Sequence, residues 1–264
     1  NVVLPPVALD GPTMTIRKFP KEKMTMERLI ELGALDEETA GFLKLLVKAR
    51  YNIFVSGGTG AGKTTFLNAL SDYIPKTERI ITIEDSAELQ LRDVENLVRM
   101  ETRNSNVEGE NAITIRDLIK ASLRMRPDRI ILGEVRDAAA YDLLSVMNTG
   151  HDGSLSTGHA NSAYDMITRL ESMVLMGIEL PMEAVRRQIA SAVDIIIHLG
   201  RLRDGSRKVT EICEVTGIEN GQVQLTSLYE FEEQAEKGRK TVQGYLKKKA
   251  ALQNKEKLKR AGLE

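Results

Sequence analysis

The stretch GGTGAGKT, residues 57–64, decides the fold, because it fits the pattern G-x-x-x-x-G-K-[ST] at every fixed position. A short apolar run, residues 52–56, comes before it, and a helical pattern, residues 63–73, comes after it. Spaced glycines let consecutive backbone N–H groups turn inward toward phosphate oxygens, and the start of the helix adds the positive end of its dipole. We therefore predict a strand, a phosphate-binding loop and a helix in direct succession.

The chemistry of this loop predicts a nucleoside triphosphate and its magnesium ion as ligands. We expect the Lys63 ammonium to reach the β- and γ-phosphates, the Thr64 hydroxyl to ligate Mg²⁺, and Thr65 to contact the α-phosphate. The expected cofactors are thus ATP and Mg²⁺. The predicted nucleotide-binding residues are Gly57, Gly58, Thr59, Gly60, Ala61, Gly62, Lys63, Thr64 and Thr65.

Beyond the loop, strand and helix patterns alternate along the chain. Such alternation is typical of an α/β fold with a mostly parallel sheet whose two faces are covered by helices. The expected strands are residues 52–56, 79–84, 128–133, 154–159 and 194–199, and the expected helices are residues 63–73, 114–124, 137–147, 163–174 and 181–192.

The segments on either side of this core have patterns of their own. Residues 24–50 carry apolar side chains at helical spacing with a break near Gly33, which predicts two helices. Further on, residues 208–215 and 222–231 resemble two strands joined across Glu219-Asn220-Gly221, a good hairpin turn.

We divide the chain into three parts. Residues 1–22 are interpreted as the remnant of an N-terminal domain with its linker, residues 23–232 as the core domain, and residues 233–264 as a basic tail that we expect to be helical. The tail is either a solvated basic helix or a contact for an anionic membrane surface or a partner protein. Because the sequence begins with Asn1 rather than Met, we expect it to be a piece of a longer protein.

Composition narrows the classes of function. The chain has 37 Lys and Arg against 38 Asp and Glu, only 4% aromatic residues and no Trp, so neither overall charge nor base stacking favours a nucleic-acid partner. Cys213 is the single cysteine, so no disulfide can form within the chain. Together with the lack of a signal-peptide pattern, this favours a reducing cytosol. No apolar run approaches the roughly 18 residues of a membrane-spanning helix.

Acidic side chains follow two of the expected strands. RIITIED delivers Glu84 and Asp85, and RIILGE delivers Glu134. Because ligands bind at the carboxyl ends of parallel strands, we expect these acids to stand beside the phosphate loop. Many ATPases place an Asp where this chain has Gly133, and the missing Cβ leaves room there, so Glu134 can reach the Mg²⁺ shell or polarise the attacking water.

Four motifs together resemble the secretion-superfamily ATPases, which power type II and type IV secretion and pilus assembly. Their order along the chain is that of the family, and Gly-Glu in place of Asp is the family's own pattern. They are the phosphate loop GGTGAGKTT (57–65), the "Asp box" ITIEDSAELQL (81–91), the strand RIILGEVRD (129–137) and the "His box" GHDGSLSTGHAN (150–161).

The resemblance is strongest to the tight-adherence (Flp) pilus branch, through PPVALDGPTMTIRKF, NLVRMETR and TIRDLIKASLRMRPDRI. It covers about residues 3 to 232, and it implies a RecA-like P-loop core that works as an ATP hydrolase. Most of the family's N-terminal domain is absent from this sequence. The family further implies a homo-hexameric ring with ATP at the seams between subunits.

The resemblance also implies roles for matching positions. Lys63 and Thr64 fall on the phosphate and Mg²⁺ ligands, Glu134 on the water-polarising catalytic acid, and Glu84 on the acid that supports the water or the metal shell. Thr64, Glu134 and Glu84 would thus surround the metal. His159 falls on the second histidine of the His box, where a neutral ring can hydrogen-bond to the γ-phosphate.

Other histidines and the arginines leave alternatives open. His151, the first histidine of the His box, is as well explained as a loop residue, and His198, within an apolar run, is better explained as a hydrogen-bonded core residue. A γ-phosphate arginine is expected, and Arg124 is placed among the catalytic residues, although surface ion pairing explains any single candidate equally well. The candidates are Arg99, Arg103, Arg116, Arg124, Arg126 and, more weakly, Arg17.

We therefore expect a cytoplasmic ATP-driven motor, peripheral to the inner membrane, that works on a membrane platform protein during assembly or secretion of pilin-like subunits. A conjugative type IV or a type II secretion ATPase is the near alternative. A RecA-type nucleic-acid motor and a nucleotide-gated scaffold without turnover are more distant ones. The intact Lys63 and Glu134 disfavour the scaffold.

Overall fold

The computed structural model describes residues 1–264 except 17, 19–23, 92–93, 107–108, 235–240 and 264. The described strands are β1 (Val2–Val3), β2 (Thr13–Met14), β3 (Ile53–Gly57), β4 (Arg79–Glu84), β5 (Asn96–Glu101), β6 (Arg129–Leu132), β7 (Leu155–His159), β8 (Ile195–Arg201), β9 (Arg207–Glu219), β10 (Gln222–Glu233) and β11 (Gly244–Lys248). The helices are α1 (Met26–Glu31), α2 (Glu37–Lys48), α3 (Lys63–Ser71), α4 (Ile115–Ser122), α5 (Ala139–Asn148), α6 (Ala163–Gly177), α7 (Met182–Ala192) and α8 (Glu256–Ala261).

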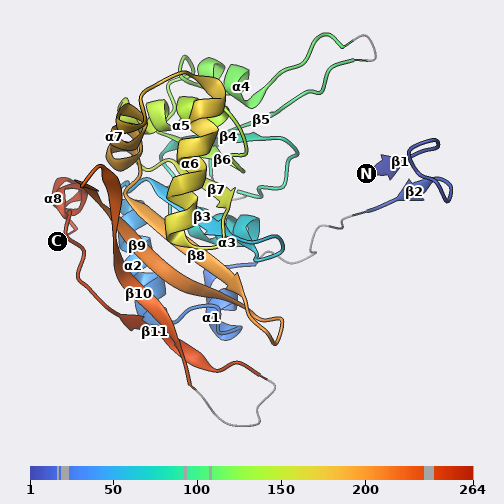
Figure 1. Ribbon diagram of the computed structural model, residues 1–264. Coiled ribbons are helices and arrows are strands. Elements are labelled where there is room, and N and C mark those ends of the chain that lie inside the picture. The colour runs from blue at the N-terminus through green and yellow to red at the C-terminus, as the bar shows by residue number, and fades with distance from the viewer. Residues whose placement is uncertain (17, 19–23, 92–93, 107–108, 235–240, 264) are drawn as a thin grey trace.

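A nine-stranded sheet with the order β11-β10-β9-β8-β3-β7-β6-β4-β5 organises the molecule (Figure 1). The strands from β8 to β5 in this order run parallel, and β9, β10 and β11 add antiparallel neighbours at one side. The expected α/β fold with a mostly parallel sheet is confirmed. All six parallel strands therefore end at the same edge, and the phosphate loop follows β3 in the middle of that edge.

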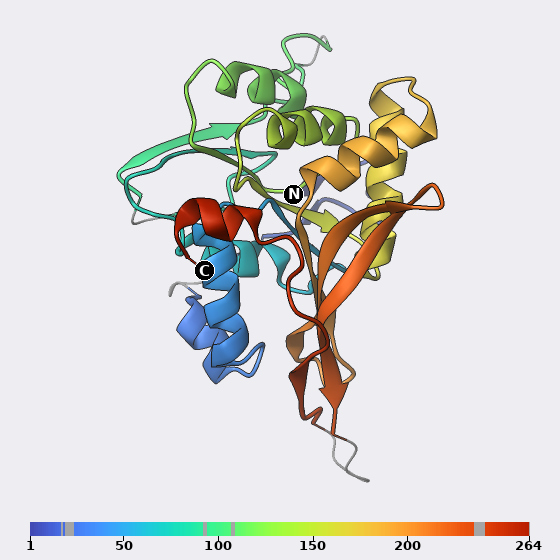
Figure 2. The ribbon, with the colours of Figure 1, turned by 90° about the vertical axis from the view of Figure 1, so that its left-hand side faces the viewer.

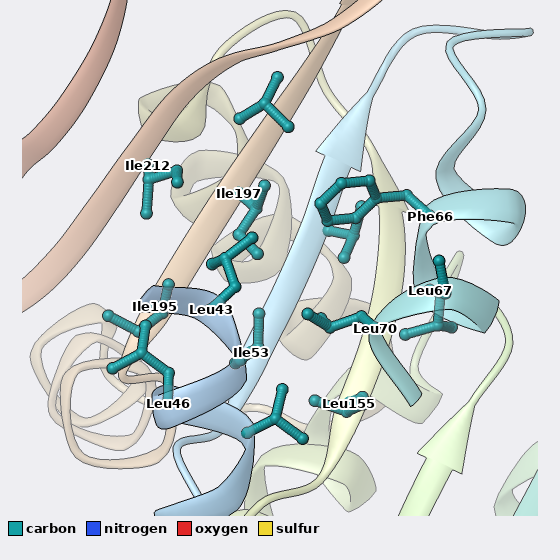
Figure 3. Packing of buried hydrophobic residues seen from close by; sticks show 14 of the residues in the cluster. Leu43, Leu46, Ile53, Phe66, Leu67, Leu70, Leu155, Ile195, Ile197 and Ile212 are labelled. Atoms are coloured by element: carbon teal, nitrogen blue, oxygen red, sulfur yellow. The ribbon is translucent and has the colours of Figure 1, made fainter. Parts of the chain in front are cut away.

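Helices cover both faces of the sheet, as Figure 2 shows from the side. Strand β3 is buried along its whole length, so its side chains alternate between two apolar clusters. Ile53 lies in the cluster beneath α2 and α3, and Phe54 lies in the cluster beneath α5, α6 and α7. Figure 3 shows part of the first cluster, in which Leu43 of α2 and Leu70 of α3 lie on either side of Ile53.

Helix boundaries follow the capping residues in the sequence. The Asp36 carboxylate accepts the Thr39 N–H at 2.7 Å and starts α2, which explains the break between α1 and α2. Thr114 and Asp117 form a reciprocal capping box at the start of α4. Ser162 is the N-cap of α6, and its side chain accepts the Asp165 N–H. The hairpin between β9 and β10 turns at Asn220 and Gly221, as expected, and both have positive φ.

Two segments differ from the expectation. Asn96–Glu101 was not anticipated as a strand, but it forms β5, a parallel edge strand beside β4. The helical prediction for the basic tail was wrong over Gly244–Lys248, which forms β11 against β10. The reason is charge complementarity across the strands, because Lys247 and Lys249 pair with Glu232, at 2.9 and 3.0 Å.

The remaining tail returns beneath the amino ends of the strands. Glu214 accepts the N–H groups of Gln253 and Asn254, at 2.8 and 2.7 Å. Lys257 contacts Asp194 at 2.6 Å and Asp152 at 2.7 Å, so it joins the segments that lead into β8 and β7. The tail is thus part of the fold, and several of its cations are already paired.

At the same end of the sheet, Arg129 begins β6 and is fully buried. It donates two hydrogen bonds to the Glu78 carboxylate, at 2.5 and 3.0 Å, and a third to the Val47 carbonyl at 2.7 Å. The charged group is therefore paired with a carboxylate and hydrogen-bonded to the backbone, which is how an arginine tolerates burial.

The N-terminal residues form a small separate hairpin. Val2 and Val3 pair with Met14 and Thr13, and Figure 1 draws this hairpin apart from the main sheet. Among the described residues, no helix combines the length and the apolar character that crossing a bilayer requires.

Candidate nucleotide site

The loop between β3 and α3 has the backbone that phosphate binding requires. Gly60 and Gly62 have φ values of 73° and 94°, a left-handed conformation that favours glycine. Gly62 is the N-cap of α3, so the helix begins at Lys63, where the sequence predicted it. The backbone thus has the form of an anion-binding loop at a helix start.

Lys63 is folded into this loop. Its Nζ donates to the carbonyls of Gly57 and Gly58, each at 3.0 Å, and lies 3.2 Å from Nδ1 of His159. Burial lowers the pKa of Lys63, and the Glu134 carboxylate opposes that shift. The ammonium is therefore held at the mouth of the loop by groups that a phosphate can replace.

His159 stands at the carboxyl end of β7, directly beside Gly57 in the parallel pairing. Because a lysine ammonium can only donate, Nδ1 of the ring is the acceptor, and the proton of the neutral ring lies on Nε2. Burial lowers the pKa of His159 below its ordinary value of 6.5, as do the nearby cations, although Glu134 opposes them. The ring is therefore neutral at physiological pH.

Glu134 follows β6 and completes a row of three side chains. Its Oε1 lies 2.9 Å from His159 Nε2, and its Oε2 accepts from Arg136 at 2.6 Å. Oε1 is buried and has no formed hydrogen bond within the described chain, despite the nearby ring. The Glu134 carboxylate thus lies between the His159 ring and the Arg136 guanidinium, and Oε1 can still accept a hydrogen bond.

Glu84 ends β4 and occupies the space that Gly133 leaves free. A Cβ at position 133 would lie 3.0 Å from Cγ of Glu84. Oε1 of Glu84 accepts the N–H groups of Glu88 and Leu89, at 3.0 and 2.8 Å, and burial raises the pKa of this carboxyl. The space at Gly133 therefore serves Glu84 rather than Glu134, which corrects the interpretation made from the sequence.

Several other expected residues lie elsewhere. His151 precedes β7 and His159 ends it, so the two histidines of the His box stand at opposite edges of the sheet. Arg124 and Arg126 precede β6 and lie at the edge away from the loop. His198 is a core residue, as expected, with Nδ1 2.8 Å from the Ser56 hydroxyl.

The remaining arginine candidates are engaged within the chain. Arg99 donates to the Leu89 carbonyl, Arg103 to the Asn111 carbonyl and Arg116 to Asp142. Arg17 lies outside the described residues.

Two arginines near the loop were missed by the sequence interpretation. Arg136 contacts Glu134, and also lies 3.6 Å from Asp85. Arg207, at the start of β9, donates from Nε to the Gly60 carbonyl at 2.7 Å. Arg136 stands two residues after Glu134 in the sequence, so it could have been predicted from its position beside that acid. The second carries no local signal, because only the sheet brings it to the loop.

A magnesium ion is compatible with these residues. Thr64 lies in the first turn of α3, and the unbonded Oε1 of Glu134 offers an anionic oxygen on the same edge of the sheet. The described residues contain no group of three or more His, Cys, Asp or Glu side chains that would hold a metal ion alone. The donor set thus suits an ion bound mainly through a hydroxyl, nucleotide phosphates and water.

Comparisons with known proteins point to one family. The family model described as "Type II/IV secretion system protein" matches residues 2–261. A protein of Mycobacterium tuberculosis named as a candidate conjugal transfer protein is 40% identical over 229 residues, covering 87% of this chain and 64% of that protein. The type IV secretion system protein VirB11 of Brucella suis is 40% identical over 190 residues, covering 69% of this chain and 53% of that protein.

Solved structures agree in fold. The VirB11 ATPase of Brucella suis, solved with sulphate, has a TM-score of 0.61 at 37% identity and covers 74% of this chain and 58% of that one. The pilus retraction motor PilT with bound ADP has a TM-score of 0.52 at 25% identity, covering 80% and 54%. The chain therefore spans roughly half to two thirds of the length of these relatives.

Proposed function

We propose that this chain, which belongs to the type II/IV secretion system protein family, binds ATP at residues 57–64 and hydrolyses it to drive a secretion or pilus machine. The observation that carries the proposal is the row Lys63, His159 and Glu134 beside a phosphate loop. A cation, a neutral ring and a carboxylate meet there at the carboxyl edge of a parallel sheet.

Each residue of the row has a distinct task in this proposal. Lys63 exchanges its contacts with Gly57 and Gly58 for the β- and γ-phosphates. Glu134 orients the attacking water through its unbonded oxygen, and His159 contacts the γ-phosphate from the next strand. Magnesium, held by Thr64 with water-mediated support from Glu134 and Glu84, would neutralise charge on the phosphates. The buried Glu84 also fixes residues 88 and 89.

Loss of the γ-phosphate provides a route to mechanical work. His159 lies on β7 and Glu134 follows β6, so the contacts that hydrolysis releases belong to two neighbouring strands. We propose that subunits of a homo-hexameric ring move as rigid bodies in response. Because Arg124 and Arg126 lie away from the loop of their own chain, either one would act at the site of a neighbouring subunit.

The machine is proposed to be a membrane-embedded assembly, reached from the cytoplasmic face through a platform protein. The sequence motifs favour pilus assembly of the tight-adherence type. The relatives named for conjugal transfer and for type IV secretion favour a second class of machine, a conjugative or type IV secretion system. Deleting the gene in its own organism distinguishes them, because loss of surface fibres supports the first and loss of DNA or protein transfer supports the second.

Phosphate release by the purified protein tests the activity. Wild-type protein is expected to release phosphate from ATP only with magnesium. Glu134→Gln is expected to keep ATP affinity within about twofold and to lose at least about 100-fold in turnover, as removal of a positioned base typically does. The exposed Glu95→Gln serves as the control and should keep wild-type turnover. Normal turnover in Glu134→Gln would refute the role.

The same assay separates the nucleic-acid alternative. A secretion motor is expected to show no stimulation by single- or double-stranded DNA or RNA at low salt, where electrostatic binding is strongest. A several-fold rise in turnover on adding nucleic acid would favour the RecA-type motor instead.

A further inference from the structure

The phosphate loop has neighbours of different character on its two sides. Strand β3 lies between β7 and β8. On the β7 side stand His159 and Glu134. They contact each other, and His159 also contacts the Lys63 ammonium. On the β8 side stands the turn between β8 and β9, and Arg207 is the first residue of β9 after this turn. The proposed hydrolysis uses only the first side.

Arg207 lies directly against the loop. Its Nε donates to the Gly60 carbonyl at 2.7 Å, and its Cδ would be 3.3 Å from a Cβ at Gly62. The guanidinium is a planar fork with five N–H donors, of which this hydrogen bond uses one. Its terminal nitrogens are therefore able to donate to a phosphate while Nε keeps its contact with the loop.

A second arginine faces the first. Arg201 and Arg207 are paired directly across β8 and β9, so their side chains project from the same face of the sheet. Both are exposed, and within the described ranges neither has a carboxylate partner at ion-pair distance. Like charges in this arrangement are unfavourable unless an anion lies between or beside them. An anion bound beside Arg207 would relieve this repulsion.

The turn between Arg201 and Arg207 is held by side-chain hydrogen bonds. Asp204 accepts from the Ser206 N–H and hydroxyl, at 2.9 and 2.6 Å, and from the Val242 N–H at 2.7 Å. These bonds lower the pKa of Asp204 to about 2. Arg203, in the same turn, pairs with Glu233 instead. The position of Arg207 is thus set by the fold.

We propose that Arg207, supported by the charge of Arg201, binds the nucleotide from within the same subunit through the phosphates that ATP and ADP share. This inference rests on the proposed function, because it concerns the same loop. Arg207 contacts the loop at Gly60 and Gly62, and the backbone of such a loop cradles the α- and β-phosphates. The γ-phosphate end is assigned to the His159 side. Arg207 is therefore a retention residue for both nucleotides, distinct from an arginine that stabilises the transition state.

Equilibrium binding of ADP and of ATP to Arg207→Ala tests the proposal. Loss of a charge-assisted hydrogen bond is expected to weaken both affinities by the same factor, about 10- to 100-fold. Arg203→Ala, which removes an arginine of the same turn, should bind both nucleotides as the wild type does. Arg207→Lys should recover part of the ADP affinity.

A second variant separates anion binding from a purely structural role. Arg201→Glu places a carboxylate opposite Arg207, so it should raise the melting temperature without nucleotide and weaken ADP binding. Unchanged ADP affinity in Arg207→Ala would overturn the proposal while leaving the hydrolysis proposal intact, and so would a loss confined to ATP. Absence of nucleotide binding by the wild-type protein would instead overturn both.

Discussion

Gly133 and Glu84 fit together across β6 and β4, because the space that a side chain would need at position 133 holds the Glu84 methylenes. The separation between a Cβ built on Gly133 and Cγ of Glu84 is 3.0 Å, tighter than ordinary van der Waals contact. The acid from β4 therefore fills the space beside Gly133. The observed position of the Glu84 side chain therefore requires a residue without a Cβ at position 133.

Gly133→Ala is expected to lower the unfolding free energy by about 1–2 kcal/mol, since the added methyl overpacks a buried site. In a Glu84→Ala background the same change should cost less, because the methyl then enters free space. Urea unfolding of the two single variants and the double variant measures this coupling. Gly41→Ala is the control. It lies in α2 with nothing within 4 Å, so it should stabilise by about 0.5–1 kcal/mol. Equal costs of Gly133→Ala in both backgrounds would contradict the pairing.

The second prediction concerns the pH dependence of ATP turnover. Protonated His159 would repel Lys63 and lose its acceptor at Nδ1. Burial is the main cause that lowers the pKa of His159 below 6.5, so the ring stays neutral at pH 6.5 and above. Turnover should therefore fall only when the pH drops through this lowered pKa. His159→Asn should be slower at neutral pH and should lack this acid limb. His151→Asn, at the opposite edge of the sheet, should keep it, and loss of the limb there would reassign the titration.

The third prediction compares a buried ion pair with an exposed one. Arg129→Ala leaves Glu78 without its main partner in a buried position, so it should cost about 3–5 kcal/mol of unfolding free energy. The matched surface pair is Arg187 with Glu183, one turn apart on α7. Arg187→Ala should cost less than about 0.5 kcal/mol. Chemical denaturation at one pH measures both, and similar costs would show that the burial argument is wrong.

The fourth prediction concerns the basic tail. Lys257→Met leaves Asp194 buried without its cation, and burial already raises the pKa of that carboxyl. The variant should lose about 3 kcal/mol of stability. The exposed Lys255→Met should remain within about 0.5 kcal/mol of the wild type. If both variants are equally stable, the tail is only loosely attached and its basic residues are available to a membrane or a partner.

The sequence alone determined the phosphate loop, the order of strands and helices in the core apart from β5, and the two acids at strand ends. These features depend on residues that are neighbours in the chain. Glycine spacing sets the loop backbone, apolar periodicity sets helix or strand, and capping residues such as Asp36 and Thr114 set where helices begin. The hairpin turn at Asn220-Gly221 belongs to the same class.

Only the tertiary structure decided which distant residues meet. Strand order places His159 beside Lys63, and the length of β7 separates it from His151. Pairing of β8 with β9 brings Arg207 to Gly60, although 147 residues separate them. The tail becomes a strand because its lysines find acids on β10. Such contacts depend on sheet order and register, which are set by packing of the whole chain and leave no signal in a local pattern.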